Sequence, residues 1–203
     1  MNSYPEPQDV REDLGDKTLH AIVTAVDGAR EDLREFREIK PGWFVDFSQR
    51  LVANFIHDRI WAHMKFATLD NPDVTMIDAE PVREVRHGSK YRLRIKRHSH
   101  AAAIETFPTK AALNFWCATP ALPGLEQWSL AIGYIWDGEL GEIKQPVISF
   151  RDSKNKPRWM VELDTGQAAA GGELVFTPID PVMPAIDFDL FDGMSGQAEP
   201  DAL

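Results

Sequence analysis

Apolar residues recur every three or four positions through residues 16–39, with polar residues between them. This spacing places the apolar side chains on one stripe of a helix. The stripe consists of Leu19, Ile22, Val26, Ala29, Leu33 and Phe36. We predict a helix that begins near Asp16, a suitable N-cap, and ends near Ile39, before the Lys-Pro-Gly of residues 40–42. A pattern shorter than three heptads favours packing on the same domain, and self-association through this first helix is the alternative.

A second helical pattern covers residues 46–68. Either Asp46 or Ser48 can cap this helix, and the Asp-Asn-Pro of residues 70–72 breaks it. Its apolar face is broad and contains Leu51, Val52, Phe55, Ile56, Ile60, Trp61, Met64 and Ala67. Because only a short link through Trp43 joins the two helices, we expect an antiparallel helical hairpin over residues 14–68.

Beyond Pro72 the hydrophobic period changes from 3.6 to 2, which is typical of β-strands. The predicted strands are residues 74–77, 82–86, 91–97, 101–105, 128–136, 147–151 and 158–163, and a short helix is predicted over residues 107–117. Turn-forming residues separate the last three strands, as in an antiparallel meander, with Pro146 at a strand start. The predicted fold class is α+β, with the N-terminal helical hairpin packed on a mostly antiparallel sheet.

Residues 164–203 differ in composition from the rest of the chain. They contain 8 acids, four prolines and no Lys or Arg, so we predict an irregular acidic C-terminal tail. The chain then divides into a flexible N-terminus (1–13), a single α+β domain (14–163) and this tail. Within the tail, acids alternate with large apolar groups, and such a segment could dock on a partner or on the chain's own domain. The docking side chains would be Ile186, Phe188, Leu190 and Phe191.

The formal net charge of -10 conceals a segregated distribution of charge. Residues 81–100 carry seven bases against one acid, Glu84, whereas the tail carries only acids. The net charge argues against a general nucleic-acid coat but not against a local basic site. The single cysteine, Cys117, excludes an intramolecular disulfide framework. Because the sequence has no long apolar window and does not begin like a secretory signal, we expect a cytoplasmic protein with no membrane partner.

The basic segment is the sharpest functional feature of the sequence. On an extended strand Arg92, Arg94 and Lys96 point to one face, opposite the apolar residues that alternate with them. The candidate partner- or anion-binding residues are Arg83, Arg86, Lys90, Arg92, Arg94, Lys96 and Arg97. Their ligand would be nucleic acid, an acidic protein surface or the chain's own tail. The same pattern also suits the solvated outer face of an antiparallel sheet.

Signatures of catalysis and of metal binding are weak. His98 and His100 are two residues apart, as a metal pair would be, but no third ligand has a recognisable spacing. We assign no catalytic residue, no metal ligand and no cofactor. The sequence favours a non-catalytic binding or regulatory protein with a protein partner, like small bacterial or phage antitoxin, immunity or adaptor proteins. A nucleic-acid-associated protein that uses residues 83–97 and an enzyme of unrecognised type are the alternatives.

Overall fold

The computed structural model describes residues 4–79, 82–104, 109–116, 126–153, 156–164 and 175–179. The helices in these residues are α1 (Pro7–Ile39), α2 (Pro41–Asp46), α3 (Gln49–Ala67) and α4 (Lys110–Trp116). The strands are β1 (Val74–Ala79), β2 (Val82–His87), β3 (Tyr91–His98), β4 (Trp128–Asp137), β5 (Glu142–Ser153), β6 (Lys156–Asp164) and β7 (Val175–Ile179).

α1 is interrupted at Gly15, where φ is +66° and the backbone leaves the helical conformation. Glycine adopts this positive φ without the steric penalty of a Cβ atom. At the start of the preceding segment, the Glu6 backbone N–H donates to the Asp9 carboxylate. Val10 in this segment is fully buried. Residues 7–13 are therefore packed helix, in contrast to the flexible N-terminus that the composition of residues 1–13 predicts.

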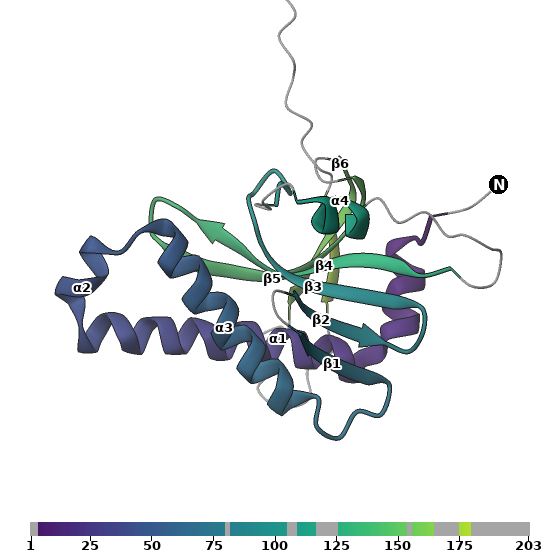
Figure 1. The fold of residues 1–203 in the computed structure, drawn as a ribbon, viewed down its shortest axis with the longest axis horizontal. Helices are drawn as coiled ribbons and strands as arrows, with labels where there is room; N and C mark the ends of the chain where they lie inside the picture. Colours follow the sequence, from purple (N-terminus) through teal and green to yellow (C-terminus); the bar gives the residue numbers. More distant parts are fainter. Residues whose placement is uncertain are drawn as a thin grey trace, which may run out of the picture.

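Of the two candidate caps of α3, Ser48 is the one used, because its side chain accepts a hydrogen bond from the backbone N–H of Leu51 at 3.2 Å. The link before it is itself a short helix, α2, with Pro41 in its first turn. α1 and α3 form a helical hairpin joined by α2, and the α2 end extends beyond the sheet (Figure 1).

The apolar stripe of α1 is buried within the protein. Five of its six predicted members lie in the main core between α1, α3 and the sheet: Leu19, Ile22, Val26, Ala29 and Leu33. The stripe is therefore not available for coiled-coil pairing with a second chain.

The strands lie in the sheet in sequence order, from β1 to β7. Neighbouring strands are antiparallel except for β3 and β4, which are parallel with Tyr91 opposite Trp128. The chain between β3 and β4 contains α4, as is typical of the crossover that parallel strands need. The register of β2 against β3 covers only Val85–His87, so the start of β2 separates from the end of β3.

Helices cover both faces of the sheet (Figure 1). α1 and α3 pack on one face, where inward-facing residues of β3 to β6 complete the main core. α4 packs on the other face, with Phe115 and Trp116 buried beside Ile104 and Ala131. Because both faces are covered, β4 is buried along residues 128–135 without the alternation of a half-exposed strand.

The predicted α+β class with a mostly antiparallel sheet is confirmed. Two local predictions in the β-rich part are corrected. Pro146 lies inside β5, opposite Tyr134, rather than at a strand start, and the β4–β5 register shifts just beyond this pair. A proline, which has no backbone N–H to donate, is tolerated beside such an irregularity. Residues 101–104 are not a strand, since only an isolated bridge joins Ile104 to His98.

β7 differs from the irregular tail predicted for residues 164–203. It pairs antiparallel with β6, with Val175 opposite Asp164 and Ile179 opposite Met160. This pairing extends the sheet by a strand that hydrophobic alternation alone did not reveal. The proposed docking residues lie outside the described part of the chain: Ile186, Phe188, Leu190 and Phe191.

Gly133 in β4 leaves no room for a side chain. A Cβ atom there would lie 2.1 Å from the backbone oxygen of Lys96, and φ is +149°. We expect Gly133→Ala to lower the free energy of unfolding by about 2–3 kcal/mol, measured by urea denaturation. Gly138→Ala is the control, because the nearest atom to its added Cβ, Trp136 Nε1, is 4.0 Å away. Equal losses in the two variants would contradict the steric explanation.

Candidate functional site

A buried carboxylate, Glu84, forms ion pairs with several arginines of the basic segment. It accepts hydrogen bonds from Arg92 Nε and Nη2 at 2.9 and 2.7 Å and from Arg86 Nε at 3.0 Å. Arg94 Nη2 lies 3.6 Å from the same carboxylate. Burial opposes ionisation of Glu84, but the hydrogen bonds from Arg92 and Arg86 outweigh it and hold the pKa below its usual range. Three of the candidate anion-binding cations thus share one internal anion.

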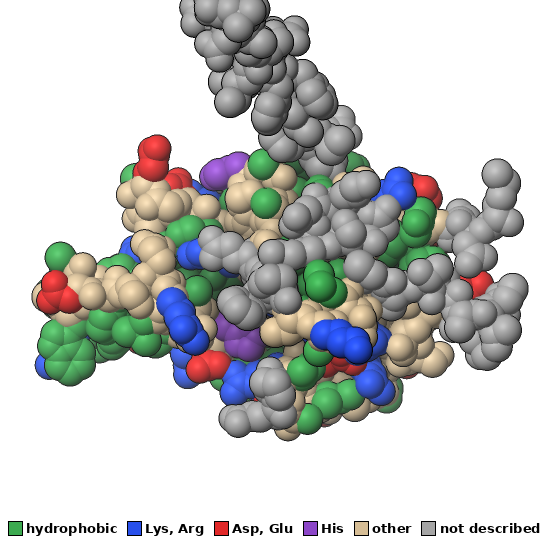
Figure 2. Space-filling view, turned by 45° about the horizontal axis from the view of Figure 1, so that its top comes forward, with side chains coloured by type: hydrophobic (Ala, Val, Ile, Leu, Met, Phe, Trp, Pro, Cys, Tyr) green, Lys and Arg blue, Asp and Glu red, His purple; other side chains and the backbone are tan. Residues whose placement is uncertain are grey.

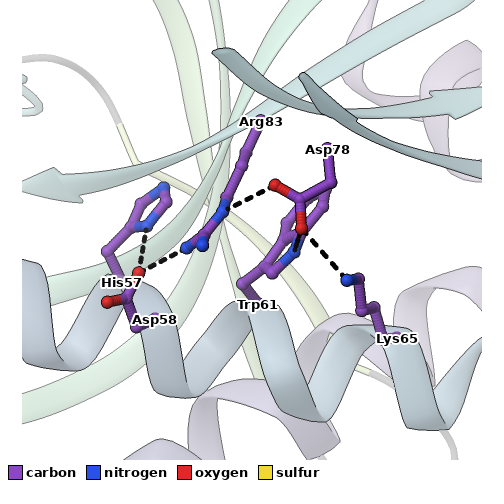
Figure 3. Close-up of polar contacts among 6 residues, drawn as sticks. All are labelled: His57, Asp58, Trp61, Lys65, Asp78 and Arg83. Carbon is purple, nitrogen blue, oxygen red and sulfur yellow. Dashed lines mark hydrogen bonds and ion pairs between the residues drawn. The ribbon is translucent and has the colours of Figure 1, made fainter. Parts of the chain in front are cut away.

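Arg83 is also neutralised from within the protein (Figure 3). Its guanidinium pairs with Asp58 of α3 and, through Nε at 3.1 Å, with Asp78 of β1. Asp78 in turn accepts hydrogen bonds from Lys65 and from the Trp61 indole at 3.0 and 3.1 Å. The hydrogen bonds from Lys65 and Arg83 lower the pKa of Asp78 to about 2. This network ties the β1–β2 hairpin to α3.

The remaining basic residues lie in different surroundings. Lys90 pairs with Asp13 of α1, and the Tyr91 hydroxyl donates to the same carboxylate at 2.6 Å. The Arg97 guanidinium lies 5.9 Å from the centre of the Trp136 ring. Lys96 has no ion-pair partner among the described residues. The seven predicted cations therefore do not form one continuous unpaired surface.

Lys96 lines a cleft that opens where β2 separates from β3. The cleft has a volume of about 740 Å³ and lies between α3 and these two strands. Its polar wall is formed by Arg50, Asn54, His57, Asp58, Arg83, Arg94 and Lys96. Figure 2 shows Lys and Arg side chains on the face where α3 meets the first strands, with Asp, Glu and His side chains among them. Arg50 has no signal in the sequence that marks it as a site residue, because its contribution depends on how α3 lies against the sheet.

The end of the helical hairpin forms a second surface, which is apolar. We define the hairpin tip as Ile39, Trp43, Val45 and Leu51, whose exposed fractions are 69%, 59%, 84% and 46%. From the sequence, Trp43 is expected in a link and Leu51 on the apolar face of a helix. Hydrophobic periodicity does not predict this surface, because it does not show where a helix extends beyond the sheet that it covers.

The two histidines considered as a metal pair differ in burial. His98 is fully buried with Nε2 3.0 Å from the Ser149 hydroxyl, whereas His100 is exposed. Burial and the charge of Arg151 lower the pKa of His98 to about 3, so it is neutral at physiological pH. Within the residues that the structure describes, no group of three or more His, Cys, Asp or Glu side chains could hold a metal ion.

No family model, curated protein or solved structure matches this chain. None of the described helices combines the length and the apolar character needed to cross a membrane. The function of the chain is therefore to be inferred from the cleft and the hairpin tip themselves.

Glu84→Gln should destabilise the protein at neutral pH, because the arginines around it would lose their buried anion. We expect the free energy of unfolding in urea at pH 7 to fall by about 2–3 kcal/mol. Because the folded-state pKa is lowered, the contribution of Glu84 is complete above its ordinary value of 4.5 and is lost as the pH falls through the lower value. The difference between wild type and variant should therefore narrow below pH 4.5.

The matched control is Glu142→Gln, which removes an exposed carboxylate 2.8 Å from Lys144. An exposed pair of this kind contributes little, so a much smaller loss is expected. If the loss of unfolding free energy in Glu84→Gln stays constant across the acidic range, the charge of the Glu84 carboxylate is not the stabilising feature.

Proposed function

We propose that this protein is a non-catalytic binding or regulatory protein that acts through contact with another protein, with the hairpin tip as its contact surface. The observation that carries this proposal is the clustering of exposed large apolar side chains. Among the described residues nine such side chains are exposed, and four of them lie within residues 39–51. Contiguous apolar groups on the surface of a folded protein are typical of interaction sites.

Aromatic packing beneath the tip holds it in place. The Phe36 ring stacks against the rings of Phe47 and Phe55, with centroids 5.7 and 5.1 Å apart. Phe44 contacts Phe47 and carries the Arg37 guanidinium 4.2 Å from its ring centre. The exposed side chains are thus presented on an ordered support, which reduces the entropy lost when a partner binds.

Trp43 has the chemistry of an interface anchor. Tryptophan is enriched among the residues that contribute most to binding energy, because it buries a large rigid surface. The Lys40 ammonium lies 5.1 Å from the centre of its ring, at the border of the apolar group. The matching partner surface is an apolar pocket bordered by a carboxylate.

The nucleic-acid alternative draws less support from this arrangement. Phosphate groups would have to displace Glu84 from Arg86 and Arg92, and Asp13 from Lys90. Breaking buried or partly buried pairs opposes such binding. Docking through the acidic tail remains a second proposed mode of contact.

Site-specific photo-crosslinking tests the proposal in cells that express the full chain. A photoreactive residue at position 45 should yield a crosslinked protein, because Val45 is the most exposed of the four tip side chains. The matched control is position 69, just beyond the C-terminal end of α3, where Leu69 is 72% exposed. The Trp43→Ser substitution should reduce the crosslink at position 45 by about tenfold or more, as expected for an interface anchor.

Circular dichroism should show that the Trp43→Ser protein remains folded, because the side chain is exposed. A product at twice the mass of the chain would identify a second copy as the partner. Equal crosslinking from positions 45 and 69, or a product unaffected by Trp43→Ser, would overturn the assignment of the tip as the contact surface.

A further inference from the structure

The cleft beside α3 follows from the way in which two strands separate. β2 pairs with β1 along its whole length but with β3 only at Val85–His87. The backbone of residues 94–96 in β3 therefore has no paired strand on the side of β2. α3 lies across the opening between the two strands. A cavity of about 740 Å³ remains between these three elements. A second hollow of about 150 Å³ adjoins it, sharing Asn54, His57, Ile95 and Lys96.

The cleft carries an excess of positive charge. The described residues that line it include four cations, Arg50, Arg83, Arg94 and Lys96, and one carboxylate, Asp58. Asp58 is already paired with Arg83, which also binds Asp78 outside the cleft. No acid is paired with Arg50 or Lys96 among the described residues. The wall thus has at least two positive charges available to an anion.

Arg94 is held in place but incompletely satisfied. Its guanidinium lies 3.8 Å from the centre of the Phe115 ring, so α4 fixes its orientation from the other face of the sheet. Glu84 is 3.6 Å from one terminal nitrogen, a distance longer than a hydrogen bond. The Nε atom is buried without a hydrogen-bond partner in the described part of the chain. Such unsatisfied donors are infrequent in folded proteins.

We propose that this cleft binds a small phosphorylated molecule, with its phosphate group between Arg50, Arg94 and Lys96. A phosphate dianion matches two unpaired positive charges and offers acceptors to the fork-shaped guanidinium groups. Asn54 and His57, one and two turns after Arg50 on α3, supply hydrogen bonds for the remainder of the molecule. This site is separate from the hairpin tip, and its test does not depend on the protein partner.

The size of the cleft favours a metabolite over a polymer. Its volume lies within the range of about 300–1,000 Å³ that is usual for small-molecule sites. Nucleic-acid binding instead requires a track of many phosphate contacts. The neighbouring cations that could extend such a track, Arg86, Arg92 and Lys90, are paired with Glu84 and Asp13.

The state of Lys96 agrees with an anion site. The pKa of Lys96 is lowered to about 8, mainly by burial and to a smaller extent by the positive charge of Arg94. A buried ammonium without a carboxylate destabilises the folded protein, and a bound dianion would relieve that penalty. His57 does not supply the positive charge, since burial lowers its pKa below 6.5 and leaves it neutral at pH 7 and above.

Isothermal titration calorimetry with inorganic phosphate and with ribose 5-phosphate tests the proposal on the full chain. Wild type should bind one equivalent of each, with ribose 5-phosphate the tighter because the sugar adds contacts. Lys96→Met and Arg50→Ala should each weaken binding by about tenfold or more. Lys110→Ala removes an exposed cation that does not line the cleft and should leave affinity within about twofold of wild type.

Thermal unfolding separates a binding role of Lys96 from a structural one. Lys96→Met replaces a partly buried ammonium, which has no acid partner among the described residues, by an apolar side chain of similar length, so it should raise the melting temperature while it weakens phosphate binding. A variant that loses both stability and affinity would show that Lys96 is a structural residue. Phosphate affinity that is unchanged in Lys96→Met and Arg50→Ala, or absent in wild type, would overturn the proposal.

The pH dependence of sulfate binding gives an independent readout, since sulfate keeps its charge across this range. Affinity of wild type should fall between pH 7 and pH 9 as Lys96 loses its proton, whereas Lys96→Met should show no such fall. The charged and titratable groups that surround Lys96 are Arg94 and Arg97 of β3, Arg83 of β2, Tyr134 of β4, and Arg50, His57 and Asp58 of α3.

A single-stranded oligonucleotide or a phosphoserine peptide that binds tighter than ribose 5-phosphate at the same residues would replace the metabolite as the ligand and overturn the assignment.

Discussion

The packing of α1 against α3 on one side and against β4, β5 and β6 on the other is the constraint on which the remaining architecture depends. Arg30 adds polar contacts to this packing, donating to the backbone oxygens of Ile143 and Lys144 at 3.0 and 2.7 Å. Because α1 occupies the middle of the sheet, α3 lies over β3 and toward the β1 edge. The β1–β2 hairpin then reaches α3 through Arg83 and Asp78, and the cleft lies in the space left open.

Both proposed surfaces follow from the same arrangement. The helical hairpin extends beyond the sheet that it covers, so the side chains around α2 have no strand to pack against and remain exposed (Figure 1). At the opposite side of α3, the cations of the basic segment divide into two groups. Arg86, Arg92 and Lys90 pair with internal acids, whereas Lys96, like Arg50 of α3, is paired with no acid among the described residues.

The elements that the sequence predicts correctly are those that depend on residues close together in the chain. The Ser48 cap, the end of α1 before Pro41 and most strand positions involve residues within a few positions of one another. The parallel pairing of β3 with β4 was not predicted, because a period of two is the same for parallel and antiparallel strands. β7 was missed for a related reason, since its pairing with β6 is a long-range contact in a segment rich in prolines and acids.

In the candidate site, too, some features follow from neighbouring residues in the sequence and others from long-range packing. Sequence by itself determined that the cations of β3 alternate with apolar residues and that positive charge gathers in residues 81–100. Only the tertiary structure decided which of those charges are neutralised. Lys90 pairs with Asp13, 77 residues away, and Glu84, although it lies in the same segment, reaches Arg92 because β2 pairs with β3. It also brought Arg50 and Lys96 to the same cleft and left Trp43 exposed. Periodicity and capping act over a turn of helix or a pair of strand residues, whereas burial and ion pairing depend on how whole elements pack.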